Sequence, residues 1–296
     1  MWQVTLALLP AAAVALWQFG LGAAIVMAVS IAGCTATEYI VNRFMLRRGF
    51  TLADGSAFLT GLLLALNLPS NLPVWAVLIG CVAATGIGKM AFGGLGCNIF
   101  NPALVGRVFL LLSFPVLMTS WPLPGHDLTA YTDASTGPTL LGILNEGGTP
   151  AVSIADEISG HTGGSMGETG AAAILLGMAW LLCRRVITWH IPVAIIATVA
   201  LMTALLGGHV ITELTAGGLL LGAVFMATDY VTSPVTSKGM IVYGILIGVI
   251  TVVIRRWGAY PEGVSFAILL GNGATPLINR WCKPRRYGEE RRKVAA

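Results

Sequence analysis

Long apolar runs separated by short polar stretches make up most of the chain, and this pattern predicts a helical membrane protein. A helix needs about 20 apolar residues to cross a bilayer. Eight runs fit this length or approach it: Trp2–Phe19, Leu21–Val41, Val74–Phe92, Ala103–Thr119, Gly170–Cys183, Ile191–Leu206, Met240–Ile254 and Gly263–Ile278. Two further runs, Gly55–Leu68 and Glu213–Thr228, are short or irregular. The pattern therefore predicts an all-α polytopic membrane protein with about ten spans, two of them interrupted.

The two irregular runs resemble each other. Thr60–Ala65 contains a glycine followed by three leucines and leads into the polar stretch Asn67–Pro73. Gly217–Gly222 has the same arrangement and leads into Thr228–Pro234. Paired interrupted spans in matching places indicate an internal repeat with a binding site between its halves. Because the similarity is short, chance explains it equally well when it is taken alone.

One long polar segment, residues 120–168, separates five predicted spans from the next five. It contains no Lys or Arg, whereas basic residues follow the second, sixth and eighth spans and crowd the C-terminus. Because Lys and Arg favour the cytoplasmic side, both termini are expected in the cytoplasm and this segment outside it. Arg255 and Arg256, which follow the ninth span, are exceptions to this rule because they would lie outside the cytoplasm. An anionic partner on the outer face is one explanation. An odd number of spans in each half then makes the repeat an inverted one.

These patterns divide the chain into four parts. We expect a first membrane repeat at 1–119, an extracytoplasmic loop at 120–169, a second membrane repeat at 170–282 and a basic cytoplasmic tail at 283–296. The expected location is the cytoplasmic membrane, crossed many times.

Composition supports this class of protein. Of the 296 residues, 56% are hydrophobic and 10% are charged, and the mean hydropathy is +0.82. Soluble domains average about 25% charged residues. The net charge of +4 is small and lies near span ends, so it does not indicate a nucleic-acid partner. The five cysteines are scattered singly, so no metal site is predicted.

Four polar stretches at span ends are candidates for chemistry. The glycines of Gly93–Pro102 let backbone approach a ligand or ion, and Asn101 lies at its end. Gly163–Gly170 leads into a span, and free amides at a helix start can receive a phosphate. The other two are Ala227–Pro234 and Tyr260–Phe266. A plain turn between helices is the alternative for each, and the absence of a P-loop pattern excludes nucleotide hydrolysis of that type.

Ionisable residues at membrane depth are costly to bury and tend to mark transport pathways. Five are candidates: Glu38, Lys89, Arg107, Asp229 and Glu262. We interpret the first three as residues whose side chains extend to the cytoplasmic interface, and Asp229 ranks highest. Together with Asn101, Asp229 and Glu262 are the predicted ion-pathway residues. No catalytic residue is predicted.

Several motifs in chain order resemble one family. They are Gly93–Gly96 with Phe100–Ala103, Ser113–Pro115 with Met118–Trp121, Trp189–Pro192, Thr228–Asp229 with Thr232–Pro234, Pro261–Ala267 and Pro284–Gly288. This set resembles the RnfD and NqrB superfamily over nearly the whole chain. RnfD belongs to the Rnf complex, an ion-translocating ferredoxin:NAD oxidoreductase. NqrB belongs to the sodium-pumping NADH:quinone reductase.

The resemblance implies a covalent cofactor. In this family a threonine that ends a D-x-x-[ST]-G-A-T motif is joined to the phosphate of FMN by a flavin transferase outside the cytoplasm. Asp133–Thr139 matches, which assigns the attachment to Thr139 and includes Asp133 and Gly137 in the site. Ser165 and Glu168, in the stretch before the next span, are the other expected cofactor-binding residues. Pro138 stands where the family usually has alanine and restricts the backbone, so Thr136 is the alternative acceptor.

The resemblance also implies a urea-transporter-like fold of two inverted five-helix repeats. It implies a non-autonomous redox subunit that couples electron transfer to movement of Na+ or H+. Its expected partners are other Rnf subunits in the membrane, including a second flavin-bearing subunit and iron–sulfur subunits. Related subunits can hold a noncovalent riboflavin, and the resemblance leaves open whether this chain holds one. The alternatives are an NqrB-type subunit and a urea-channel-like transporter without a redox role.

Overall fold

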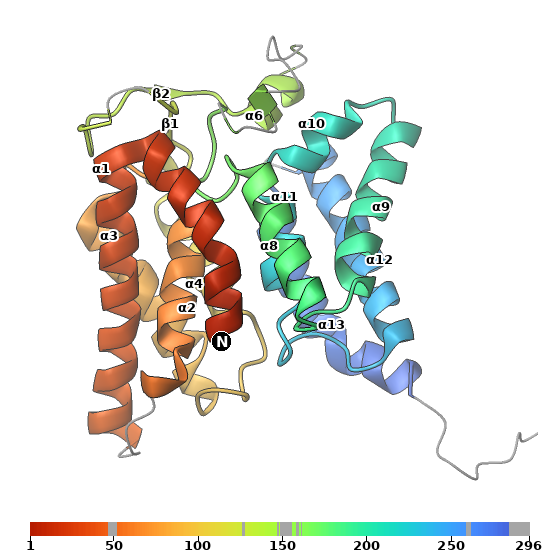
Figure 1. The fold of residues 1–296 in the computed structure, drawn as a ribbon. Helices are drawn as coiled ribbons and strands as arrows, with labels where there is room; N and C mark the ends of the chain where they lie inside the picture. Colours follow the sequence, from red (N-terminus) through yellow and green to blue (C-terminus); the bar gives the residue numbers. More distant parts are fainter. Residues whose placement is uncertain are drawn as a thin grey trace, which may run out of the picture.

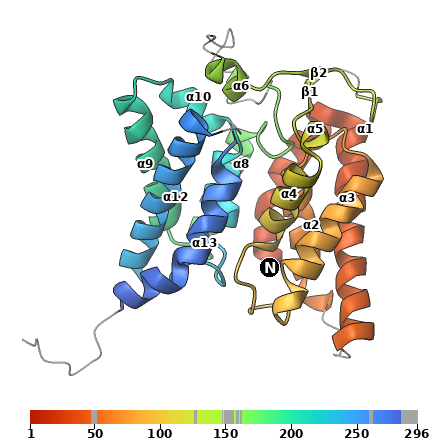
Figure 2. The same cartoon turned by 180° about the vertical axis from the view of Figure 1, so that it is seen from behind.

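Two groups of helices stand side by side in the computed structural model, which describes residues 1–46, 52–125, 128–146, 148, 156–157, 160, 162–258 and 262–283. One group contains α1 to α4 and the other α8 to α13 (Figure 1). The view from behind shows the same separation (Figure 2). The segment that carries β1, β2 and α6 lies across one end of both groups.

The elements of the first group occupy the first 118 residues. They are α1 (Trp2–Ile40), η1 (Val41–Leu46), η2 (Leu52–Asp54), α2 (Ser56–Leu66), α3 (Val74–Cys81), η3 (Val82–Ile87), η4 (Met90–Phe92), α4 (Pro102–Ser113) and α5 (Pro115–Met118). Strands β1 (Trp121–Pro122) and β2 (Thr136–Gly137) pair antiparallel, and α6 (Leu140–Asn145) follows. The second group comprises α8 (Ala171–Cys183), α9 (His190–Leu205), α10 (Val210–Thr215), α11 (Leu219–Leu221), η5 (Gly222–Met226), α12 (Ser237–Trp257) and α13 (Val264–Trp281).

Helix α1 consists of two helical arms that meet at Gly20. This glycine has φ 55° and ψ −127°, a backbone conformation that interrupts the helix and that L side chains rarely adopt. A Cβ atom at this position would lie 2.1 Å from the carbonyl oxygen of Leu128. In Figure 1 the chain rises to this point and then turns back. The break falls between the predicted spans Trp2–Phe19 and Leu21–Val41, so the boundary between those spans is confirmed.

Both segments that the sequence marks as irregular are short helices that begin at a glycine with positive φ. Gly55 precedes α2 with φ 69°, and Gly218 precedes α11 with φ 63°. Leu62–Leu64 lies in the second half of α2, well after Gly55, whereas Leu219–Leu221 begins directly after Gly218. The similar leucine triplets therefore occupy different positions in the two segments.

Three described helical stretches are long and apolar enough to cross a membrane: Trp2–Leu46, Val74–Phe92 and Ser237–Trp257. Four shorter apolar helices accompany them: Ser56–Leu66, Pro102–Ser113, Ala171–Cys183 and His190–Leu205. The chain is thus a helical membrane protein, whereas the number of ten crossings stays a prediction. The predicted tail at 283–296 lies outside the described residues except for Lys283.

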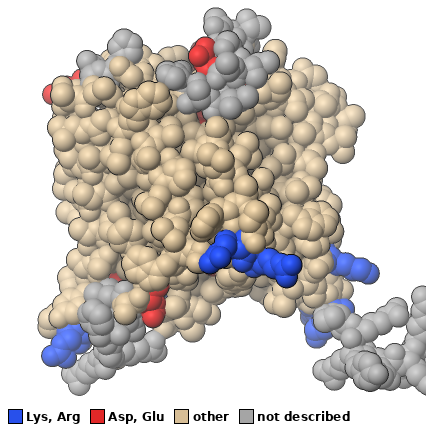
Figure 3. Space-filling model, in the orientation of Figure 1, with Lys and Arg blue, Asp and Glu red and all other residues tan. Residues whose placement is uncertain are grey.

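Charged side chains are distributed unequally between the two ends of the molecule. In Figure 3 the Lys and Arg side chains in view lie toward the end opposite α6. Arg43 in η1, Arg184 after α8, Lys238 at the start of α12 and Arg280 near the end of α13 belong to that end. The described part of the polar segment around α6 carries no Lys or Arg.

Close approach of α2 to α1 depends on Gly61. A Cβ atom there would lie 2.7 Å from Ile31 Cα and 2.8 Å from the carbonyl oxygen of Ser30, and neither backbone atom can rotate away. The Ser30 hydroxyl also donates to the Gly61 carbonyl oxygen at 2.8 Å. Small residues permit such backbone contact between membrane helices.

Gly61→Ala is therefore expected to destabilise the protein by about 1–3 kcal/mol, the usual cost of overpacking. Gly86→Ala is the matched control, because the nearest neighbours of its added Cβ would lie 3.9 Å away. Thermal unfolding in detergent, followed by tryptophan fluorescence, measures both. Equal midpoints for the two variants would contradict the close contact at Gly61.

Candidate functional site

Thr139 begins helix α6 on the end of the molecule that carries the polar segment. Its Oγ1 accepts a hydrogen bond from the Gly142 amide at 3.1 Å, which is the usual contact of an N-cap threonine. The residue is 5% exposed, whereas Thr136 on β2 is exposed. Gly137 pairs with Trp121 across the two short strands. The local structure thus separates the two candidate hydroxyls into one buried cap and one exposed strand position.

The predicted phosphate-binding stretch Gly163–Gly170 lies beside this segment. A Cβ atom on Gly163 would lie 3.4 Å from the carbonyl oxygen of Pro138, the residue before Thr139. Ser165 and Glu168 are buried, and Glu168 Oε2 accepts from the Ser165 amide and hydroxyl at 3.2 and 3.3 Å. The structure therefore brings the two predicted cofactor-binding stretches together. Asp133 is exposed in the preceding turn.

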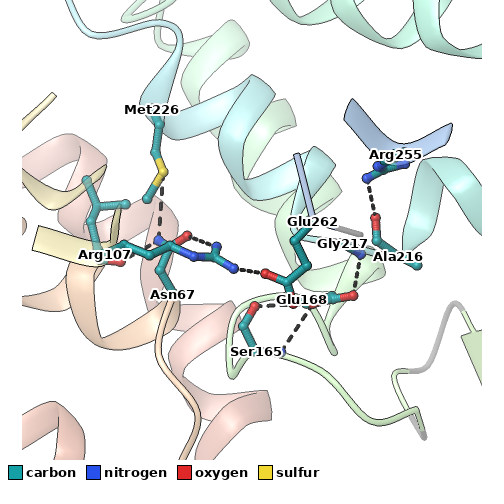
Figure 4. Close-up of polar contacts among 10 residues, drawn as sticks. Asn67, Arg107, Ser165, Glu168, Ala216, Gly217, Met226, Arg255 and Glu262 are labelled. Carbon is teal, nitrogen blue, oxygen red and sulfur yellow. Dashed lines mark hydrogen bonds and ion pairs between the residues drawn. The ribbon is translucent and has the colours of Figure 1, made fainter. Parts of the chain in front are cut away.

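A buried ion pair connects the two helix groups. Arg107 of α4 forms an ion pair with Glu262, which precedes α13, and donates to Asn67 Oδ1 at 2.8 Å (Figure 4). Arg107 is 3% exposed. Arg107 Nε and Glu262 Oε1 are buried without a hydrogen-bond partner among the described residues. Tyr260 and Pro261, in the predicted stretch Tyr260–Phe266, lie outside the part of the chain that the structure describes.

The ends of the two interrupted segments meet beside this pair. Asn67 follows α2, and its amide nitrogen lies 3.7 Å from the sulfur of Met226, the last residue of η5 (Figure 4). Asn101 caps α4 through Ala103 and donates to the Met226 carbonyl oxygen at 3.2 Å. Side-chain amides and a methionine thus come together where these segments meet, and a binding site at this place stays a prediction. Asn101, a predicted ion-pathway residue, belongs to this cluster.

Arg255 and Arg256, the two arginines that dissent from the charge rule, both pair within the chain. Arg255 is 3% exposed and donates to the carbonyl oxygens of Glu213 and Ala216. Arg256 forms an ion pair with the Glu213 carboxylate at 3.1 Å. Arg255 therefore stabilises the end of α10 and offers no free surface charge to an anionic partner.

The interpretation of Glu38, Lys89 and Arg107 as side chains that extend to the interface is wrong. All three are 2–3% exposed. Lys89 Nζ lies 2.6 Å from Glu38 Oε2 and 2.7 Å from the hydroxyl oxygen of Ser56. A buried charge requires a partner in apolar surroundings, and packing supplies one to each of these residues.

A cavity of about 160 Å³ lies between the two helix groups. Its polar lining includes Ser56, Lys89, Asn98, Asn101, Thr228 and Asp229. Asp229 follows η5 in a turn and lines this cavity. The Thr232 hydroxyl lies 3.5 Å from that carboxylate. Asp229 and Asn101 thus share one cavity, which Glu262 does not line.

Sequence reasoning missed the roles of Arg107, Asn67, Met226 and Lys89. A single arginine within an otherwise apolar run was the available signal for Arg107, and the polar residue directly after a leucine run was the signal for Asn67. Nothing in the sequence indicated a role for Met226, because its contacts arise from residues more than a hundred positions away.

Similarity to known proteins extends over the whole chain. A sequence profile described as the NQR2, RnfD, RnfE family matches residues 1–288. The chain is 45% identical over 302 residues to the D subunit of the Na(+)-translocating ferredoxin:NAD(+) oxidoreductase complex of Acetobacterium woodii, covering 100% of this chain and 92% of the relative. It is 42% identical to the D subunit of the ion-translocating oxidoreductase complex of Stutzerimonas stutzeri, covering 99% and 92%. It is also 42% identical to the D subunit of the proton-translocating ferredoxin:NAD(+) oxidoreductase complex of Clostridium ljungdahlii, covering 98% and 92%.

Proposed function

The chain belongs to the NQR2, RnfD, RnfE family, and from this premise we propose that it is the RnfD-type subunit of an ion-translocating ferredoxin:NAD oxidoreductase. It relays electrons through FMN esterified to Thr139 and couples this relay to movement of Na+ or H+ across a bacterial membrane. Its relatives carry names of Na+- and H+-translocating complexes, so the ion itself is left open. The other subunits of the complex supply the ferredoxin and NAD chemistry.

The match of Asp133–Thr139 to the family motif carries the cofactor assignment, and the contact at Thr139 is compatible with it. Thr139 Oγ1 serves as a hydrogen-bond acceptor for the Gly142 amide. A phosphoester oxygen keeps lone pairs, so esterification is compatible with this cap. FMN attached there supplies one- and two-electron transfer, while the protein determines its position and surroundings. Because Thr139 is buried, we infer that neighbouring residues move aside when a flavin transferase modifies it.

The orientation follows from the charge distribution. Basic side chains lie toward the end opposite α6 (Figure 3), and basic residues favour the cytoplasmic side. We infer that this end faces the cytoplasm together with both termini. On this orientation α6 and Thr139 lie outside the cytoplasm, where the flavin transferase that modifies members of this family acts.

An inverted repeat is the architecture that we propose for the two helix groups. The first group contains the two arms of α1, then α2, α3 and α4, and the second contains α8, α9, the interrupted segment α10–η5, α12 and α13. The positive-φ glycines before α2 and α11, and the meeting of Asn67 with Met226, support the pairing of the interrupted segments. A site between such segments suits ion transport.

The cavity and the central amide cluster define the proposed ion pathway. Asp229 and Asn101 line the cavity, and Asn101 also contacts Met226, next to the pair formed by Arg107 and Glu262. The cavity volume of about 160 Å³ suits water and a small ion, and pockets for drug-sized ligands are usually about 300–1,000 Å³. We therefore assign no riboflavin site to it.

Replacement of Thr139 tests the proposal directly. We expect wild-type protein, coproduced with its flavin transferase, to fluoresce in a denaturing gel under ultraviolet light. Thr139→Ala should lose nearly all of this fluorescence, because the attachment oxygen is gone, whereas Thr136→Ala should keep it. Gel fluorescence normalised to stained protein provides the measurement.

Other outcomes favour the alternatives. Fluorescence that survives Thr139→Ala and disappears in Thr136→Ala would move the attachment to the exposed hydroxyl. An unmodified wild-type protein would favour a urea-channel-like transporter. If flavinylated protein assembles into a complex that reduces quinone with NADH and does not act on ferredoxin, the NqrB-type function holds instead.

A further inference from the structure

Helix α6 packs directly on the residues that precede α11 within the second interrupted segment. Leu140 and Leu141 form a small apolar cluster with Ala216, apart from the main core. A Cβ atom on Gly217 would lie 2.4 Å from Leu141 Cδ1. Because α6 starts immediately after Thr139, the proposed flavin attachment and the start of α11 belong to one packed unit. Movement of α6 is therefore expected to displace Gly217.

Glu168 makes a second connection between the same two places. Its Oε1 accepts from the Gly217 amide, and its Oε2 accepts from the amide and hydroxyl of Ser165 (Figure 4). Ser165 lies two residues after Gly163, which lies against the carbonyl oxygen of Pro138. The carboxylate thus joins the turn beside the flavin-bearing segment to the first residues before α11.

Two buried arginines lie around Glu168. Figure 4 shows its side chain beside the ion pair of Arg107 with Glu262, and a Cβ atom on Gly217, whose amide Glu168 binds, would lie 2.7 Å from Arg255 Nη2. All three charged groups are at most 6% exposed, where water screens charge poorly. A change of charge near this triad therefore alters the forces on the Gly217 amide.

The other end of the interrupted segment reaches the contact between the helix groups. From Gly217 the chain runs through α11 and η5 to Met226, whose carbonyl oxygen and sulfur contact Asn101 and Asn67. Asn67 in turn accepts from Arg107. The segment therefore connects the outer polar segment with the proposed ion pathway.

We propose that Glu168 is the positioning residue that couples the flavin-bearing segment to α11 and η5 of the second interrupted segment. When the charge beside Thr139 changes, the balance among Glu168, Arg107 and Arg255 changes, the Gly217 amide shifts, and the contacts of Met226 with Asn101 and Asn67 rearrange. This role rests on the proposed function, because it needs a redox group on the α6 segment.

The test uses the complete complex in liposomes and compares Glu168→Gln with wild type. Glutamine keeps the shape and an acceptor for the Gly217 amide but removes the charge between the arginines. We expect the ions taken up per electron to fall at least about fivefold, the lower range of measured coupling between sites. The ratio is taken per electron and per flavinylated protein, so a change in flavin attachment or electron flux does not enter it. Glu157→Gln is the matched control, because this buried acid contacts Thr212 and Thr215 of α10 instead of Gly217.

Amide hydrogen exchange separates coupling from a purely structural role. In wild type, chemical reduction of the flavin should change exchange in peptides covering 217–226, and in Glu168→Gln this redox-dependent difference should disappear. If Glu168→Gln does not assemble, Ser165→Ala, which removes one donor to Glu168, should give the same loss in weaker form.

Two outcomes overturn the inference in distinguishable ways. Wild-type protein without covalent flavin overturns the proposed function together with this role. Wild type that is flavinylated and coupled, with Glu168→Gln or Ser165→Ala retaining the same ion-to-electron ratio and the same redox-dependent exchange, overturns the role of Glu168 alone.

Discussion

Arg107→Met is expected to lower the free energy of unfolding by about 3–5 kcal/mol, the usual effect of removing one partner from a buried ion pair. The change leaves the Glu262 carboxylate uncompensated and the Asn67 amide oxygen without its donor, in the interior between the two helix groups. Methionine has a similar length and is apolar, so loss of packing contributes little. Denaturant or thermal unfolding in detergent, followed by tryptophan fluorescence, measures the change.

The double variant Arg107→Met with Glu262→Gln provides the control. It removes both charges, and replacing a buried pair with uncharged groups is often close to neutral. We therefore expect it to recover most of the stability that the single variant loses. A single variant as stable as wild type would show that water reaches this pair and that it does not connect the two groups.

Lys89→Met is the second large effect that we expect, again about 3–5 kcal/mol of destabilisation. The ammonium group is the partner of Glu38 and Ser56, at 2.6 and 2.7 Å, and both side chains of the ion pair are 3% exposed. Its removal leaves a buried carboxylate in an apolar environment, which is costly unless the carboxylate takes up a proton. The same unfolding assay in detergent applies.

Lys238→Met is the matched control for Lys89→Met, because Lys238 is exposed at the start of α12 and forms no ion pair with the described residues. Its unfolding midpoint should equal that of wild type within error. Combining Lys89→Met with Glu38→Gln should restore most of the lost stability. If Lys89→Met alone behaved like Lys238→Met, the Lys89 side chain would extend to the interface after all.

The positions of the helices could be predicted from local pattern. In a bilayer the backbone N–H and C=O groups of each apolar run must form hydrogen bonds with one another, and a helix achieves this within the run. The break at Gly20 and the irregular segment around Gly217 and Gly218 are examples. In both cases glycine adopts a positive φ that other residues avoid. Such features depend on a few neighbouring residues, so the sequence carries them directly.

The partners of the buried charges could not be predicted in this way. Arg107 and Glu262 are 155 positions apart, and Asn67 and Met226 are 159 apart. Which of several ionisable residues meet depends on how the helices cross and rotate, and the sequence pattern does not specify this. Arg107 in an apolar run is therefore compatible with an interfacial position until the packing shows Glu262 beside it.

The sequence by itself determined the family, the helical membrane class and the segment that holds the proposed attachment residue Thr139, because motifs and apolar runs are local properties of the chain. Only the tertiary structure decided that α6 packs on Gly217, that Glu168 connects the two segments, and that Lys89 and Arg107 are buried. The physical reason is that a buried charge is stable only beside a suitable partner. That partner comes from a distant segment, and only the packing of the helices brings the two together.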